Sequence, residues 1–171
     1  GDSGDDTILG GLDGDNIYGD TFDGTNHTNI GNDTVDYSYI TGSQSITADL
    51  SLTSQQIKDR VTVTNSDTLY NIENVLATKN ADTLKGSDDF TIVNTLDGYK
   101  GNDTFYASKG LDSFIGGDGI DTADYSDATE NLDVDIADGA KFISPSQGTD
   151  TFSSIEGVIG GSGNDKLTGN T

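Results

Sequence analysis

Residues Gly98–Asp124 read GYKGNDTFY-ASKGLDSFI-GGDGIDTAD, and cutting them every nine residues gives three copies of one pattern. In each copy glycine holds the fourth place, aspartate holds the sixth, and the eighth place is apolar. Glycine permits tight turns and close backbone approach, and aspartate adds a hard, charged oxygen at a fixed phase. The short apolar-centred segment after each aspartate is typical of a β-strand. The repeat therefore predicts an all-β chain, wound as a parallel β-roll or β-helix, with cations bound at its Gly/Asp turns.

The composition points to the same architecture. The formal net charge is −22, and the sequence holds 27 Asp against 3 Glu, a bias that suits short, turn-borne cation ligands. Only 31% of the residues are hydrophobic, so without cations we expect a disordered or expanded chain. Carboxylates about 4 Å apart repel each other by ~4 kcal/mol at intermediate dielectric. Several bound Ca²⁺ ions would remove that repulsion and supply folding free energy.

The same composition excludes several classes of partner and site. The eight Lys and Arg residues are scattered and form no patch, so we expect neither nucleic acid nor an anionic membrane as a partner. There is no apolar run long enough to span a bilayer and no leader at the N-terminus. The absence of cysteine rules out disulfides, which leaves calcium as the available stabiliser. We expect a monomeric piece of a longer array, because the sequence opens on a repeat and stops inside another.

The second half of the sequence repeats the first. DTVDYS at 33–38 returns as DTADYS at 121–126, and DTLYNIENV at 67–75 returns as DTFSSIEGV at 150–158. These matches indicate two copies of a unit of about 85 residues. We expect one domain over 1–171, with units at 1–86 and 98–171 and a degenerate connecting coil at 87–97. An insertion at 19–27 and the long stretches 39–61 and 125–147 predict irregular, wider coils, in which 46–52 and 132–136 alternate as strands.

The aspartates at the sixth place are the candidate calcium ligands. Successive nonapeptides of a roll lie on opposite sides, so a cation sits between one loop and the loop two nonapeptides on. This predicts a shared site for Asp103 with Asp121 and an equivalent site for Asp6 with Asp33. The remaining predicted carboxylate ligands are Asp112 and Asp15 on the other side and Asp82 and Asp165 in a third cluster. Backbone carbonyls near Gly98, Lys100, Gly116 and Asp118 are the predicted co-ligands.

Other residues admit a plainer interpretation. A Gly/Asp-rich stretch can be an ordinary solvated turn, but a nine-residue phase over three copies favours calcium. Asp67 and Asp150 have fewer repeats beside them, so both interpretations stay open there. His27 is the only histidine and falls in the insertion, which predicts a surface residue rather than part of a triad or zinc cluster. We expect Tyr37 and Tyr125, in the repeated D-Y-S, to pack at strand ends, with sugar stacking as the alternative. We expect Phe105, Phe114 and Phe152, at the apolar eighth place of the repeat, to lie in the core.

Across most of its length the sequence resembles the RTX (hemolysin-type calcium-binding repeat) family. The complete nonapeptides at 116–124 and 160–168 carry the resemblance, and the I-E-N-V, I-E-G-V and D-Y-S links are similar to those of large bacterial RTX adhesins. The family implies a right-handed parallel β-roll, export by type I secretion, and folding on calcium outside the cell or at the bacterial surface.

The resemblance implies a structural calcium-binding module of a secreted or surface protein, with no catalysis of its own. Two alternatives stay open. The two variable loops could build a face that binds carbohydrate or another cell-surface ligand, as in an adhesin. The chain could also be a non-catalytic accessory module of a secreted enzyme, whose catalytic residues would lie elsewhere.

Overall fold

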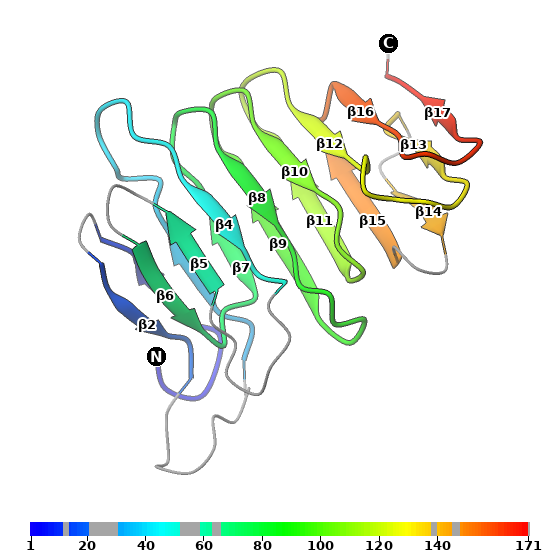
Figure 1. Ribbon diagram of the computed structural model, residues 1–171. Helices are drawn as coiled ribbons and strands as arrows, with labels where there is room; N and C mark the ends of the chain where they lie inside the picture. The colour runs from blue at the N-terminus through cyan, green and yellow to red at the C-terminus, as the bar shows by residue number, and fades with distance from the viewer. Residues whose placement is uncertain are drawn as a thin grey trace.

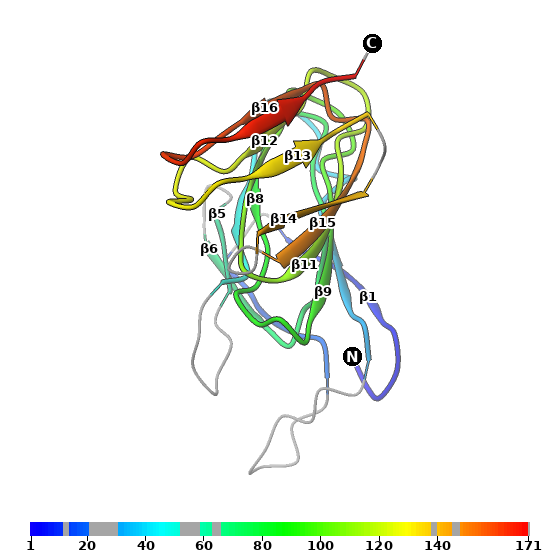
Figure 2. The same cartoon turned by 90° about the vertical axis from the view of Figure 1, so that its right-hand side faces the viewer.

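The computed structural model describes residues 1–11, 14–20, 31–51, 59–62, 66–137, 140–144 and 148–170. Within these residues the chain forms β-strands and no helix, so no helix there is long and apolar enough to cross a membrane. Two large sheets face each other, as the end-on view shows (Figure 2). The termini lie at opposite ends of the stack (Figure 1). Residues 21–27 of the insertion predicted at 19–27, with His27 among them, the polar stretch 52–58 and Pro145 lie outside the described residues.

The first sheet contains seven strands in the order β1-β3-β7-β9-β11-β15-β14. All neighbours pair in parallel except the last pair. The strands are β1 (Thr7–Leu9), β3 (Thr34–Asp36), β7 (Asn74–Leu76), β9 (Val93–Asp97), β11 (Leu111–Ile115), β15 (Gly148–Ser153) and β14 (Ala140–Ser144).

The second sheet contains eight strands in the order β16-β12-β10-β8-β4-β5-β6-β2, and a separate parallel pair is formed by β13 and β17. The strands of the second sheet are β16 (Gly157–Ile159), β12 (Thr122–Asp124), β10 (Thr104–Tyr106), β8 (Thr83–Lys85), β4 (Thr47–Asp49), β5 (Asp59–Thr62), β6 (Ser66–Tyr70) and β2 (Asn16–Tyr18). The separate pair joins β13 (Asp133–Asp135) to β17 (Lys166–Thr168).

From β7 to β12 the chain passes from one sheet to the other at every strand. The nonapeptide is the length of half a coil, because Phe105, Phe114 and Ala123 lie nine residues apart on strands of alternating sheets. The all-β parallel roll expected from the sequence is therefore confirmed. The alternating strands are confirmed too, because Ile46, Ala48 and Leu50 are buried around β4, and Leu132, Val134 and Ile136 around β13.

Two antiparallel strands interrupt the parallel winding. β5 pairs antiparallel with both β4 and β6, and β14 pairs antiparallel with β15. Both lie in the stretches for which the sequence predicted irregular, wider coils. Each such stretch therefore adds a strand to a sheet instead of only widening a coil. The glycine-poor sequence there explains the change, because it lacks the turn residues that bring the chain across to the opposite sheet.

Equivalent strands of the two copies lie in opposite sheets, for example where the D-Y-S motifs begin. The D-T-V-D-Y-S motif forms β3 in the first sheet, whereas D-T-A-D-Y-S forms β12 in the second. Among the described residues, the strand β9 has no counterpart in the first copy. It adds one half coil between the two copies, so that later strands of the two large sheets lie in the sheet opposite to their equivalents in the first copy. As a consequence, the added strand β5 belongs to the second sheet and its equivalent β14 to the first (Figure 1).

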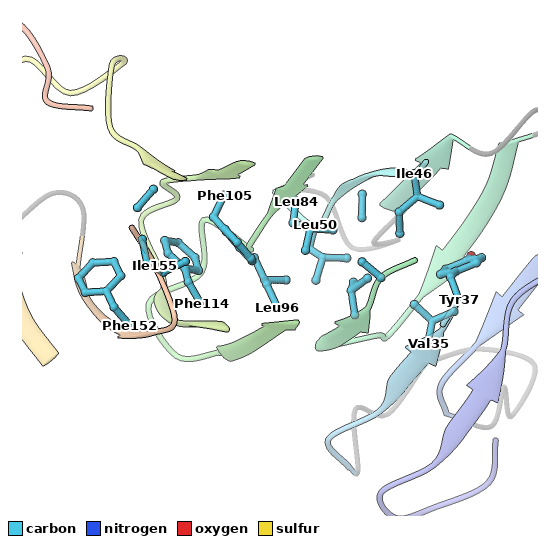
Figure 3. Close-up of a cluster of buried hydrophobic side chains, with 14 of the residues drawn as sticks. Val35, Tyr37, Ile46, Leu50, Leu84, Leu96, Phe105, Phe114, Phe152 and Ile155 are labelled. Carbon is cyan, nitrogen blue, oxygen red and sulfur yellow. The ribbon is translucent and has the colours of Figure 1, made fainter. Parts of the chain in front are cut away.

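Buried apolar residues of the short strands point between the two large sheets and build the core (Figure 3). In the first sheet Leu96, Phe114 and Phe152 stand in register, and Phe105 and Leu84 do so in the second. The rings of Phe105 and Phe114 stack with centroids 5.3 Å apart, and those of Phe114 and Phe152 lie 5.9 Å apart. Burying a side chain of this size contributes ~1.5–3 kcal/mol. The expectation that these phenylalanines form the core is confirmed.

Candidate calcium-binding turns

A chain of hydrogen bonds links the aspartates that precede the strands of the second sheet. The backbone N–H of Asp82 donates to Oδ1 of Asp103 at 2.7 Å, and the N–H of Asp103 donates to Oδ1 of Asp121 at 2.7 Å. All three side chains are at most 2% exposed. We call this row the aspartate ladder. Asp103 and Asp121, for which the sequence predicted a shared site, are adjacent members of it.

The aspartate ladder ends on a glutamate, and an equivalent row in the first copy does so too. The nonapeptide pattern did not predict these two glutamates as part of the site. The N–H of Asp121 donates to Oε2 of Glu156 at 2.8 Å. In the first copy, the N–H of Asp6 donates to Oδ1 of Asp33, and the N–H of Asp33 donates to Oε2 of Glu73, both at 2.8 Å. The turns that carry these glutamates are short, and the longer side chain reaches the same place. The repeated I-E-x-V motif could have indicated this role, because the sequence holds only three Glu and two of them occupy that motif.

The second oxygen of several of these carboxylates accepts no hydrogen bond. Among the described residues, no donor reaches Oδ2 of Asp33, Asp103 or Asp121, although each atom is buried. Leaving a buried carboxylate oxygen without a partner is costly, typically ~1–3 kcal/mol or more for a charged group. An oxygen in this position therefore calls for a donor or a cation.

The open oxygen of Asp103 faces a small recess lined by glycine. A Cβ placed on Gly98 would lie 2.2 Å from Oδ2 of Asp103 and 2.9 Å from the carbonyl oxygen of Gly116. A side chain at residue 98 would therefore fill the space between two acceptors. We call such an arrangement a cradle: a glycine, a carboxylate oxygen at the end of the same turn, and a carbonyl oxygen from the next turn on that side.

The first copy contains the equivalent cradle. A Cβ on Gly1 would lie 2.2 Å from Oδ2 of Asp6 and 2.0 Å from the carbonyl oxygen of Gly19. Here Oδ2 of Asp6 also accepts the N–H of Asp2 at 2.9 Å. The internal repeat thus reproduces the glycine, the carboxylate and the carbonyl at both positions.

The electrostatics of these turns favour binding of a positive charge. Burial raises the pKa of Asp103 to about 7, and the neighbouring carboxylates of Asp82 and Asp121 add to the increase. Burial likewise raises the pKa of Asp33 and Asp121 above the usual range. A cation between the turns would reverse these shifts, because it stabilises the ionised carboxylates directly.

On the opposite side of the roll, Asp112 is 2% exposed and its N–H donates to Oδ1 of Asp150 at 3.0 Å. The hydroxyl of Ser108 donates to one oxygen of Asp112, and no donor among the described residues reaches the other. Burial raises the pKa of Asp112 to about 6. A Cβ on Gly86 would lie 2.6 Å from both carboxylate oxygens, so glycine again leaves space beside them.

The other three predicted carboxylates are placed differently. Both oxygens of Asp82 accept hydrogen bonds from Thr78, and Oδ1 also accepts the N–H of Ile46. Asp15 is exposed at the edge of the second sheet, with its N–H donating to Oδ1 of Asp67. Asp165 is half-buried beside Gly160, and its Oδ1 accepts the N–H of Leu132 at 3.0 Å.

The predicted carbonyl ligands belong to two stacked turns. The carbonyl oxygen of Gly116 lies in the cradle of Asp103, as described above. The carbonyl of Gly98 accepts the N–H of Lys100 at 2.8 Å, and that of Asp118 accepts the N–H of Gly101 at 2.9 Å. The side chains of Lys100 and Asp118 form an exposed ion pair at 2.9 Å. The backbones of Lys100 and Asp118 also form a parallel β-bridge, which stacks the two turns in register.

The donor set suits calcium. Within the described part of the chain, no three His, Cys, Asp or Glu side chains converge on one point. A cation at a cradle would therefore be held by one or two carboxylate oxygens and by backbone carbonyls. Ca²⁺ takes six to eight such hard oxygen ligands in flexible geometry, whereas transition metals prefer nitrogen and sulfur. The acceptor-only cradles fit this requirement.

Comparison with known families agrees with this chemistry. The model of the RTX calcium-binding nonapeptide repeat, which spans four copies, matches residues 93–123 and 158–171. These two segments are similar to the RTX calcium-binding repeat, which indicates a calcium-binding structural module. A search of the curated proteins found no match.

The RTX match includes the cradle of Asp103, which lies wholly within residues 93–123. It does not include the turns of Asp6 and Asp33, nor the short turns that carry Glu73 and Glu156. The first copy lies outside the match but contains the equivalent contacts around Gly1 and Asp6.

Proposed function

We propose that this RTX module folds on binding several Ca²⁺ ions after export and acts as a structural section of a secreted or surface protein, an adhesin in the first instance. RTX repeats are typical of secreted bacterial proteins, which supports this location. The observation that carries the proposal is the buried, open oxygen of Asp103 within the Gly98 cradle. The module itself is proposed to be non-catalytic.

The cradles explain why folding would wait for calcium. Members of the aspartate ladder stack in adjacent coils, where burial and the carboxylates of Asp82 and Asp121 raise the pKa of Asp103. At neutral pH and without cations, stacking the coils makes these carboxylates either repel one another or bind protons. An acidic chain of net charge −22 then stays expanded. Extracellular modules bind calcium with Kd of about 10⁻⁴–10⁻³ M. Calcium in that range would relieve both costs and make metal binding part of the folding free energy.

Far-UV circular dichroism of the chelated protein during a calcium titration tests this proposal. We expect a coil-like spectrum in chelator and a cooperative rise of β signal with calcium. Magnesium should have much less effect, because it demands near-ideal octahedral geometry and gives up its water reluctantly. A full β spectrum in chelator that calcium leaves unchanged would contradict the proposal and leave a metal-independent β-solenoid with acidic turns.

A groove favours glycan binding as a second candidate function. It has a volume of about 610 Å³ and lies next to Glu73, where the short bridge leaves space between longer neighbouring turns. Its lining combines the polar Asn32, Asp89 and Thr91 with the apolar Ile92 and Val93. Such a mixture can bind the hydroxyls and the apolar face of a sugar. A glycan array probed with the calcium-loaded module tests this candidate, and the absence of any glycan signal would reject it.

A further inference from the structure

The two I-E bridges are the short turns at residues 71–73 and 154–156, which lead into β7 and β16. They contain no glycine and no aspartate, and neither bridge falls within the residues that the RTX repeat matches. Each bridge nevertheless stacks directly on a Gly/Asp turn of the preceding coil. The N–H of Gly19 donates to the carbonyl of Tyr70, and the N–H of Gly116 donates to that of Ser153, both at 2.9 Å.

Each bridge places a carbonyl oxygen opposite an open carboxylate oxygen. In the first copy, a Cβ on Gly19 would lie 1.8 Å from the carbonyl oxygen of Asn71 and 2.4 Å from Oδ2 of Asp33. In the second copy, a Cβ on Gly116 would lie 1.9 Å from the carbonyl oxygen of Ser154 and 2.4 Å from Oδ2 of Asp121. The two arrangements agree within 0.1 Å, although the residues that supply the carbonyls differ.

The backbone of each bridge is held in an unusual conformation that sets this carbonyl. Asn71 has φ of 51° and Ser154 has φ of 53°, and they are two of only three non-glycine residues with positive φ in the described chain. Such a conformation costs about 1 kcal/mol or more for a residue with a side chain. Two residues later, Glu73 and Glu156 accept the N–H of Asp33 and Asp121. The bridge thus fixes both the carbonyl and the aspartate of one cradle.

The space between these oxygens calls for a cation or a hydrogen-bond donor. Asp33 and Asp121 are 0% exposed, and their Oδ2 atoms have no donor among the described residues. The facing carbonyl is a second acceptor. Two acceptors cannot satisfy each other, and their proximity in a buried place is unfavourable unless a cation or a donor lies between them.

We propose that each I-E bridge closes a calcium site, formed by Asp33 Oδ2 with the Asn71 carbonyl in the first copy and by Asp121 Oδ2 with the Ser154 carbonyl in the second. This inference rests on the proposed calcium-dependent function and extends it beyond the nonapeptide turns. Each copy would then contain two successive calcium sites, one between two Gly/Asp turns and one between a Gly/Asp turn and a bridge. The bridge is the last ligand-bearing turn of each series.

Asp33→Asn and Asp121→Asn test the proposal in the full chain. Asparagine can keep Oδ1 as the acceptor of the ladder hydrogen bond, while its amide NH₂ replaces the open oxygen. Native mass spectrometry at saturating calcium should show one ion fewer in each single variant and two fewer in the double variant. Asp127→Asn, at an exposed position with the same change of charge, should keep the full count.

The results separate this inference from the function on which it rests. Wild-type protein that binds no calcium would overturn both. Wild-type protein that binds calcium, together with Asp→Asn variants that keep the full count, would overturn only the bridge sites.

Wild-type crystals grown with calcium provide a measurement that does not depend on folding of the variants. Anomalous density about 2.3–2.6 Å from Asp33 Oδ2 and the Asn71 carbonyl would support the site. A water molecule there, with no anomalous signal, would overturn it. Asn71→Gly should retain the ion, because glycine adopts positive φ without cost and keeps the carbonyl. Loss of the ion in this variant would also contradict ligation through the backbone.

Discussion

The hydroxyl of Tyr37 donates a 2.7 Å hydrogen bond to Oδ2 of Asp67, and Tyr125 makes the same contact with Asp150 at 2.6 Å. Both aspartates are 0% exposed, and their Oδ1 atoms accept backbone N–H groups as in the ladder. A tyrosine hydroxyl therefore occupies the side of the carboxylate that is open in Asp103 and Asp121. The repeated D-Y-S motif thus supplies the carboxylates of Asp67 and Asp150 with a hydrogen-bond donor from within the protein.

Replacing Tyr37 or Tyr125 by phenylalanine should destabilise the calcium-loaded protein without removing an ion. Each variant leaves a buried carboxylate oxygen without its donor, which costs about 1–3 kcal/mol. Urea unfolding at saturating calcium measures the loss, and native mass spectrometry counts the ions. Tyr106→Phe is the matched control, because the Tyr106 side chain is 36% exposed. Unchanged stability in both buried variants would show that the hydroxyls contribute nothing.

The sequence predicted the parallel winding because the nonapeptide carries its own turn and strand signals. It also placed Phe105, Phe114 and Phe152 in the core, since the eighth position of the repeat points between the sheets. Local pattern was sufficient for these elements, because each half coil repeats the same short-range geometry. The antiparallel strands β5 and β14 could not be predicted in this way, since their pairing depends on contacts outside the nine-residue phase.

The candidate site was predictable in part for a similar reason. The phase identified Asp103 and Asp121 and their neighbouring positions in adjacent coils. It did not distinguish Asp103, whose Oδ2 is open, from Asp82, whose oxygens both accept bonds from Thr78. It also missed Glu73 and Glu156, which lie in turns shorter than a nonapeptide turn. Their equivalence to the aspartates becomes visible only when the coils are stacked and the glutamates accept the same backbone N–H groups.

The stability of the calcium-free protein should fall as pH rises from about 5 to 8. Burial raises the pKa of Asp112 to about 6 and of Asp103 to about 7, against about 3.9 in an unfolded chain. The folded state therefore binds protons more tightly than the unfolded state, and this contribution is lost as pH rises through the folded pKa values. Circular dichroism in calcium-free buffer should show more β structure at pH 5 than at pH 8.

Calcium should reverse that dependence. Because the ion binds the ionised carboxylates, its binding releases protons and should weaken as pH falls from 8 to 6. The calcium concentration at the folding midpoint, measured at both pH values, tests this. A midpoint independent of pH would show that these aspartates do not bind the ion.

Gly98→Ala should remove one calcium ion and raise the calcium concentration needed for folding. The added methyl would lie 2.2 Å from Oδ2 of Asp103, in the space that the ion would occupy. Isothermal titration calorimetry and native mass spectrometry report the lost site. Gly169→Ala is the control, because nothing lies within 4 Å of a Cβ at that position. Full occupancy in Gly98→Ala would contradict the cradle as a calcium site.

Lys100→Ala should leave the number of calcium ions unchanged. The exposed ion pair of Lys100 with Asp118 contributes little, because solvent screens it, and only the backbone at residue 100 lies among the predicted ligands. Native mass spectrometry of the variant at saturating calcium provides the count. Loss of an ion would mean that the lysine side chain, by holding the two turns in register, is required for the site.

The Phe114→Ala variant should need a higher calcium concentration to fold. Phe114 is 0% exposed and packs between Phe105 and Phe152, so truncation should cost about 3–5 kcal/mol. Because calcium binds the folded state, a higher calcium concentration can offset that loss. The midpoint of the calcium titration should therefore shift upward, while the ion count at saturation stays the same. Phe90→Ala, at a residue 49% exposed, should leave the midpoint nearly unchanged. An unchanged calcium midpoint in Phe114→Ala would contradict the prediction, because it would mean that folding on calcium does not depend on packing of the core.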